Sequence, residues 1–198
     1  MVHSMKEREQ KLSSRKKPYF PNLRSAVISI AVVAFLLFFA GFAIDRNNVN
    51  RLQRYEKEAI WYFEQSYDQI EQRFSYAQKL VELIADTTLT DEISQTIQMF
   101  EGVESPQVLS ELYGKLDGQL DILQRKIFTD QDYLLYAAYY EKIYACEKEM
   151  QPYLDAYNAK ATYFNQQIGG FPALFAAKRL EMEKLELFSV ASALKSRP

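Results

Sequence analysis

Histidine and cysteine, which supply most metal ligands and catalytic bases, are nearly absent from this chain of 198 residues. His3 is the only histidine and Cys146 the only cysteine. These counts exclude zinc sites built on histidine, serine and cysteine triads, and di-iron sites that need Glu-x-x-His pairs. The sequence also has no phosphate-binding glycine loop and no GxSxG motif. We therefore expect no enzymatic activity, no cofactor and no metal.

A single cysteine cannot form an internal disulfide. We interpret Cys146 as a small buried apolar residue, with a reactive or intermolecular thiol as the alternative. Glycine and proline are also scarce, with six of each. This scarcity disfavours a turn-rich all-β fold, and the 48% of apolar residues is enough for a packed core. We predict an all-α fold.

Charge is unevenly distributed along the chain. Residues 1–24 hold seven Lys or Arg and two Glu, residues 25–44 hold no charge, and residues 45–198 hold the remaining 17 basic and 24 acidic residues. An acidic main part does not favour nucleic acid, which binds clustered cations. We interpret residues 1–24 as a basic cytoplasmic arm that sets membrane orientation, with binding to anionic lipid headgroups as the alternative.

Residues 25–44 are long and apolar enough to cross a lipid bilayer. Twenty residues of helix span about 30 Å, which is the hydrocarbon thickness. A cleaved signal peptide is the alternative, because Gly41-Phe42-Ala43 resembles a cleavage site, but the run exceeds the apolar length usual for such signals. We therefore predict a single transmembrane helix. The excess of Lys and Arg before it predicts a cytoplasmic N-terminus, with the bulk of the chain outside the plasma membrane.

Beyond this segment the sequence is typical of long helices. Residues 45–86 lack Pro and Gly, so we expect them to continue the membrane helix. A short helix is predicted over 91–101 and ends at Gly102. Ser105 and Pro106 are typical of the cap and first turn of the next helix. After a turn over 129–132, a long helix is predicted over 133–168.

Apolar stripes with alternating spacings of three and four mark the faces on which these helices should pack. In the first long helix the stripe is Ile60, Phe63, Tyr67, Ile70, Phe74, Ala77, Val81 and Ile84. In the helix after Pro106 it is Leu109, Leu112, Leu116, Leu120, Leu123 and Ile127. In the last long helix it is Tyr133, Tyr136, Tyr140, Ile143, Glu147, Met150, Leu154, Tyr157, Ala161, Phe164 and Ile168. Glu147 is the one polar member, and it either sets the helix register or lies where the stripe meets solvent, with a functional site as a further alternative. The many tyrosines indicate core packing, with an exposed stripe that receives a partner helix as the alternative.

These patterns predict an elongated antiparallel four-helix-type bundle over residues 45–190, followed by a tail over 191–198. The first and last long helices have similar lengths and should pair in opposite directions. Pro152 should bend the last long helix. Residues 173–193 are helix-like and should add a further helix.

The end of the last long helix carries a motif that resembles a known family. Tyr157-Asn158, Phe164-Asn165 and Phe171-Pro172 are similar to the LemA family pattern, in which two Tyr-Asn pairs seven residues apart precede a Phe-Pro. The chain departs from the family at Phe164, at the usual Pro-Asn of the first long helix, and at the usual Gly-Phe, which is Glu181-Met182 here. The resemblance implies a membrane-anchored, mostly helical protein without an established enzymatic activity. Some relatives are linked to membrane remodelling or to membrane-protein quality control.

The same residues have a physical interpretation. Asn158 and Asn165 are seven residues apart and share one helix face, where their amides could bond the backbone of the following loop. Gly169 and Gly170 permit a left-handed helix cap, and Phe171 should tuck beneath the helix end. Binding of a partner or ligand by this motif is the alternative.

We therefore predict a scaffold or protein-interaction role at the cell envelope. The expected partners are the lipid bilayer and other membrane or envelope proteins, and a homo-oligomer is left open. A ligand-sensing helical bundle that signals through a partner membrane protein is the alternative function.

Overall fold

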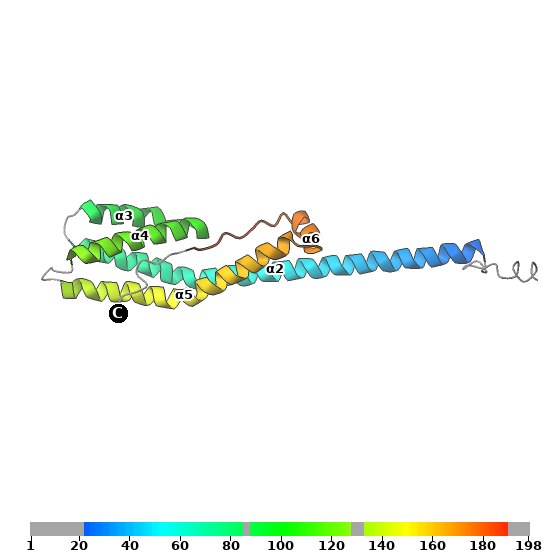
Figure 1. Ribbon diagram of the computed structural model, residues 1–198, viewed down its shortest axis with the longest axis horizontal. Coiled ribbons are helices and arrows are strands. Elements are labelled where there is room, and N and C mark those ends of the chain that lie inside the picture. Colours follow the sequence, from blue (N-terminus) through cyan, green and yellow to red (C-terminus); the bar gives the residue numbers. More distant parts are fainter. Residues whose placement is uncertain (1–21, 85–87, 128–132, 190–198) are drawn as a thin grey trace, which may run out of the picture. The chain divides into compact units, whose positions relative to one another are not determined.

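The computed structural model describes residues 22–84, 88–127 and 133–189, and every regular element in these ranges is a helix. The predicted all-α class is therefore confirmed for the described part. In chain order the helices are α2 (Leu23–Leu83), α3 (Thr88–Phe100), α4 (Pro106–Ile127), α5 (Tyr133–Gly169) and α6 (Ala173–Arg179) (Figure 1). The chain divides into two compact units, Met1–Asn47 and Asn48–Pro198.

The first unit contains the beginning of α2, in which residues 25–44 carry no charge. The large apolar side chains between Val27 and Ile44 are each more than half exposed. This part of α2 is long and apolar enough to cross a membrane, and none of it is buried inside the protein. Polar and charged residues return at Asp45, so the unburied apolar surface coincides with the predicted membrane segment.

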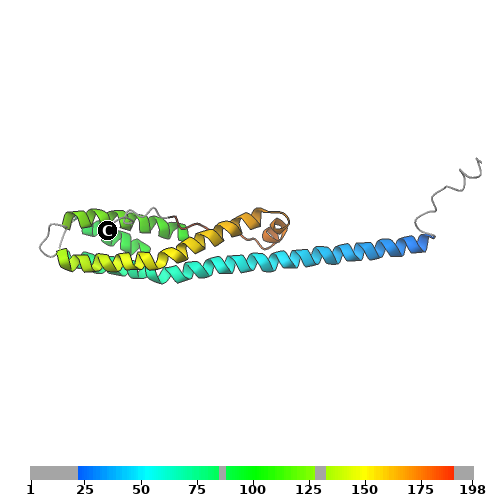
Figure 2. The same ribbon diagram turned by 60° about the horizontal axis from the view of Figure 1, so that its bottom comes forward.

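The second unit has a hydrophobic core to which α2, α3, α4 and α5 all contribute. Several side-chain contacts join α2 to α5. Arg51 donates to Gln167 at 3.3 Å, the rings of Tyr55 and Tyr163 have centroids 4.9 Å apart, and Lys160 donates to Glu58 at 2.8 Å. Residue numbers rise along α2 as they fall along α5, so the two helices run in opposite directions here. Figure 2 shows α5 beside this part of α2.

Helices α3 and α4 lie side by side in this unit (Figure 1). The turn after α3 is made by Gly102, whose φ of 76° is left-handed and is readily adopted only without a Cβ atom. At the start of α4 the Val108 N–H donates to the Ser105 hydroxyl at 3.3 Å. Ser105 is therefore the predicted cap and Pro106 the first helical residue.

The predicted stripes agree with burial except at particular positions. From Tyr136 to Ile168, every stripe residue of α5 is buried, including Glu147. In α2 the prediction for Ile60 was wrong, because Ile60 is 41% exposed and its neighbour Ala59 is fully buried. The stripe also omitted Arg73, a charged residue that is fully buried. Pro152 lies on the exposed side of α5, and Figures 1 and 2 show the helix changing direction near its middle.

The end of α5 differs from the prediction at three points. Phe171 is 86% exposed rather than tucked beneath the helix, and its peptide bond to Pro172 is cis. In the described part of the chain the glycine with a left-handed φ is Gly102, so Gly169 and Gly170 end α5 without a left-handed cap. The helix predicted over 173–193 ends at Arg179, because Glu181 adopts a φ of 52° and the Met182 N–H bonds the Ala177 carbonyl. This left-handed cap ends α6 and turns the chain.

The predicted turn over 129–132 and the predicted tail over 191–198 lie outside the described residues, as does most of the basic arm.

Candidate interaction site

The site lies where residues 180–189 return along α5. We call these residues the tail segment; they precede the predicted tail over 191–198. No helix or strand is assigned to this stretch, yet its backbone is held by side chains of α5. The Asn165 amide donates to the Leu185 carbonyl at 2.8 Å and accepts the Leu185 N–H at 2.8 Å. The Asn158 amide does the same for Phe188, at 2.7 Å and 2.9 Å. We call Asn158 and Asn165 the asparagine clasp.

Helix and strand dimensions explain why the two asparagines are seven residues apart. Seven residues of helix rise by about 10.5 Å. Three residues of extended chain cover about 10 Å. The spacing between Asn158 and Asn165 therefore matches the spacing between Phe188 and Leu185 when the tail segment runs antiparallel to α5. Each amide offers a donor and an acceptor, and so pairs with a backbone N–H and C=O as a neighbouring strand would.

Aromatic rings fix the far end of the tail segment. Phe188 is 2% exposed, and its ring centroid lies 5.9 Å from that of Tyr113 and 6.3 Å from that of Phe63. Tyr157 packs against Phe63 at 5.0 Å, and its hydroxyl donates to the Glu186 carbonyl. Burial, together with the nearby Glu186 carboxylate, raises the pKa of Tyr157 to about 12, so its hydroxyl stays protonated as a donor.

Glu186 connects the tail segment to the beginning of α4. Its carboxylate accepts from the Ser105 hydroxyl and, at 3.4 Å, from the Gln107 N–H. A carboxylate at this end of a helix is favoured, because the first backbone N–H groups have no partner within the helix. The tail segment thereby joins α5 to α4.

A second polar feature lies within the core of the same unit. Arg73 on α2 forms a fully buried ion pair with Asp117 on α4, and its guanidinium lies 3.9 Å from the centre of the Tyr113 ring. The Arg73 Nε and Nη1 atoms and the Tyr113 hydroxyl are buried without a hydrogen-bond partner. Burial raises the pKa of Tyr113, so this ring remains neutral beside the cation.

On the outside, α2 and α5 line an open groove. Arg54, Lys57, Trp61 and Lys160 are among the residues that line it. Trp61 is half exposed, and Glu58 and Lys160, which form an ion pair at 2.8 Å, also line the groove. The groove offers an aromatic surface together with positive charge.

The residues of the predicted motif are only partly brought together. Tyr157, Asn158 and Asn165 contact the tail segment, and Phe164 is fully buried beside Leu52 and Ile168 in a smaller cluster with α6. Gly169 ends α5, and Gly170, Phe171 and Pro172 form the turn to α6; the described structure gives none of the four a contact with the tail segment. The asparagines bond the backbone as expected, but at Leu185 and Phe188 rather than in the Gly-Gly-Phe-Pro loop.

Sequence reasoning missed the importance of Arg73 and Glu186. Among the described residues, no group of three or more His, Cys, Asp or Glu is arranged to hold a metal ion. Burial and the nearby Glu149 raise the pKa of the Cys146 thiol, which disfavours the reactive thiolate. The site is thus suited to holding extended backbone and aromatic side chains.

Comparisons with protein-family models, with curated proteins and with solved structures give no match to this chain. The likeness to the LemA family therefore rests on the spacing of the motif between Tyr157 and Pro172.

Proposed function

We propose that this chain is a single-pass membrane protein whose second unit is an antiparallel helical bundle that serves as a scaffold for other membrane or envelope proteins. The observation that carries the proposal is the wholly unburied apolar part of α2 in a protein whose second unit has a separate core. Water makes such a surface unfavourable, whereas a bilayer accepts it and requires a helix there.

The direction of insertion follows from charge. Residues before the apolar segment are more basic than those after it, which favours a cytoplasmic N-terminus and a second unit outside the plasma membrane. The resemblance to the LemA family agrees with this topology, and its relatives linked to membrane-protein quality control agree with a scaffold role. Neither argument requires a catalytic group.

The groove beside Trp61 is the surface on which we expect a partner to bind. A half-exposed tryptophan that lines a groove together with charged side chains is typical of residues that carry binding energy. Arg54, Lys57 and Lys160 favour a partner segment that combines apolar and acidic side chains.

Photo-crosslinking in intact cells tests the proposal. A photoreactive phenylalanine analogue replaces Trp61 in the full-length chain, and Lys115 on the exposed side of α4 is the matched control position. We expect adducts with a defined membrane or envelope protein at position 61 and not at position 115, identified by mass spectrometry. Adducts only with the chain itself, or the same adducts at both positions, would contradict the scaffold role.

A further inference from the structure

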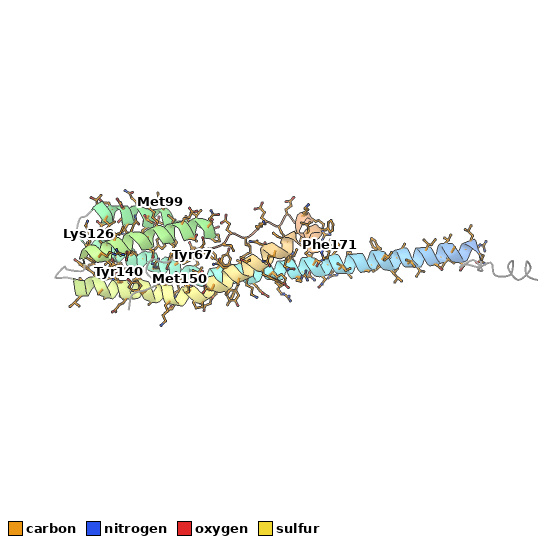
Figure 3. The ribbon with its side chains drawn as sticks, viewed as in Figure 1. Tyr67, Met99, Lys126, Tyr140, Met150 and Phe171 are labelled. Carbon is orange, nitrogen blue, oxygen red and sulfur yellow. The ribbon has the colours of Figure 1, made fainter. Side chains whose placement is uncertain are left out.

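Two phenylalanines, one in the turn from α5 to α6 and one within α6, are exposed to solvent although the opposite face of α6 is well packed. Phe171 is 86% exposed and Phe175 is 64% exposed, and their rings meet edge to face at 6.0 Å. Leu180, at the other end of α6, is 38% exposed. Figure 3 places Phe171 at the outside of this turn. Large aromatic side chains are usually withdrawn from water, so their exposure needs an explanation.

Packing of the opposite face of α6 holds these rings outward. Ala173, Ala176 and Ala177 are buried against Leu52, Phe164 and Ile168. With about 3.6 residues per turn, a helix that buries positions 173, 176 and 177 must direct positions 175 and 178 away from the core. The exposure of Phe175 is therefore a consequence of the fold.

The charge on α6 itself is positive. Lys178 and Arg179 lie in the last turn of α6, and both side chains are exposed, while the acidic residues Glu181 and Glu183 follow after the helix. Arg51 of α2 is held beside the same end of α5 by its hydrogen bond to Gln167. Exposed aromatic and aliphatic side chains next to Lys and Arg are typical of surfaces that enter the headgroup region of a membrane.

The chain itself keeps this surface near the membrane segment. Val49 packs against the cluster formed by α6, Leu52, Phe164 and Ile168, and it is only five residues beyond Ile44, the last residue of the apolar segment. Five residues extend by no more than about 18 Å, whatever their conformation. A bilayer that holds residues 25–44 is therefore within reach of Phe171 and Phe175.

We propose that Phe171 and Phe175, with Lys178, insert into the outer leaflet of the bilayer and dock the second unit on the membrane surface. This proposal rests on the membrane anchoring proposed above. Its ligand is the lipid surface itself, with anionic headgroups preferred because of the positive charge at this turn. Docking would give the scaffold a fixed orientation toward neighbouring membrane proteins.

Depth-dependent fluorescence quenching tests the proposal in the full-length chain. Trp61 is the only tryptophan, so a Trp61→Phe background leaves no native signal. In this background Phe175→Trp is reconstituted into liposomes of phosphatidylcholine and phosphatidylglycerol whose acyl chains carry bromine. Phe171→Trp is the second reporter, for the case in which Phe175→Trp disturbs folding as seen by circular dichroism. Ile122→Trp is the matched control, because Ile122 is 57% exposed on α4. Ile122 lies one helical turn before Lys126, and Figure 3 shows Lys126 at the other end of the second unit from Phe171.

The result expected is strong quenching of Phe175→Trp by brominated lipid and little quenching of Ile122→Trp. Phe38→Trp, within the apolar segment, reports on anchoring separately. If Phe38→Trp is quenched and Phe175→Trp behaves as Ile122→Trp, docking is overturned while anchoring stands. If Phe38→Trp is not quenched, the anchoring fails and the docking with it. Emission of Phe175→Trp that shifts to shorter wavelength with rising protein-to-lipid ratio, without quenching, would show that a second copy covers the surface, and would also overturn the proposal.

A charge reversal tests the preference for anionic lipid. We expect Lys178→Glu to lower the quenching of Phe175→Trp, and Lys115→Glu on α4 to leave it unchanged. Equal quenching in both variants, and in liposomes of phosphatidylcholine alone, would overturn the electrostatic part of the proposal.

Discussion

The two parts of α2 belong to one helix but are built for different surroundings. From Val27 to Ile44 every large apolar side chain is more than half exposed, whatever its position around the helix. From Asn48 to Leu83 the buried residues recur on one side only, and Leu52, Ala59, Ile70, Ala77 and Leu80 are completely buried. Uniform apolarity suits a solvent that surrounds the helix, whereas a one-sided stripe suits neighbouring helices.

A continuous helix does not by itself indicate whether lipid or protein surrounds it. The period of its apolar residues does indicate this. Helical propensity runs through both parts without a Pro, and Gly41 is the single glycine of α2. Substitutions that attack each part separately should therefore have different consequences.

Charge placed in the first part should have the largest effect. We expect Leu36→Arg with Leu37→Arg to move the protein from the membrane fraction to the soluble or aggregated fraction, because each arginine costs about 3 kcal/mol at the centre of a membrane helix. Flotation of membranes on a density gradient measures the change. Glu64→Arg with Gln65→Arg, on an exposed face of the second part, is the control and should still float. Equal flotation of both double variants would remove the distinction between the two parts.

Charge placed in the second part should destabilise the core without releasing the protein. Ile70 is fully buried, and Ile70→Asp leaves an unpaired carboxylate there, so we expect a loss of about 4 kcal/mol of unfolding free energy. Thermal unfolding of the full chain in detergent, followed by circular dichroism, reports the loss, and Gln72→Asp on the exposed face is the matched variant. An unchanged melting temperature for Ile70→Asp would mean that the core does not include this position.

The buried ion pair should behave differently from an apolar contact. Asp117→Ala leaves the Arg73 cation buried without a partner, and we expect it to cost about 3–5 kcal/mol. Arg73→Met with Asp117→Leu replaces the pair by apolar side chains and should recover most of that loss. A double-mutant cycle of unfolding free energies measures the difference. If the double variant is as unstable as Asp117→Ala, the polar pair contributes more than charge neutralisation.

The asparagine clasp should contribute less to the unfolding free energy than the buried ion pair, and its effect should be more local. Asn158→Ala removes two hydrogen bonds to Phe188, and we expect a loss of about 2 kcal/mol. Hydrogen exchange at the Phe188 amide should accelerate while the amides of α4 keep their protection. Gln166→Ala, on the exposed face of the same helix, is the control. Uniform acceleration across the second unit would show that the tail segment is part of the global folding unit.

Most of the helices were predictable because each buries one stripe of its residues. The α5 stripe is a long example, in which even Glu147 was placed correctly on the buried face. The register failed locally at Ile60, where the small Ala59 occupies the core and no size rule favours it. Arg73 was missed because pattern reading assigns arginine to water, and only the facing Asp117 makes its burial acceptable.

The tail segment could not be predicted for a different reason. Leu185 and Phe188 are three residues apart, which fits an apolar helix face as well as an extended chain whose ends are both held. The choice is made by Asn158 and Asn165, some 20 to 30 residues earlier in the chain. The seven-residue spacing of the asparagines was visible, but their partners were not. The exposure of Phe171 could not be predicted either. A Phe beside a Pro at a helix end is expected to be buried unless it is known that alanines form the packed face of α6.

The smallest expected effect concerns the ion pair that joins the second part of α2 to α5. The hydrogen bond from Lys160 lowers the pKa of Glu58, and the same bond raises the pKa of Lys160. The stabilisation from the charged Glu58 is therefore present above its usual pKa of 4.5 and is lost as the pH falls through the lowered pKa. The stabilisation from the charged Lys160 is present below its usual pKa of 10.5 and is lost as the pH rises through the raised pKa. Both side chains are more than a third exposed, so solvent screening limits the pair to about 0.5 kcal/mol. The unfolding free energies of the parent and of Glu58→Gln should differ by this amount between the lowered pKa of Glu58 and the raised pKa of Lys160, and should converge outside this range, with Glu64→Gln as the control. A difference that persists in strong acid would assign the effect of Glu58 to packing instead of charge.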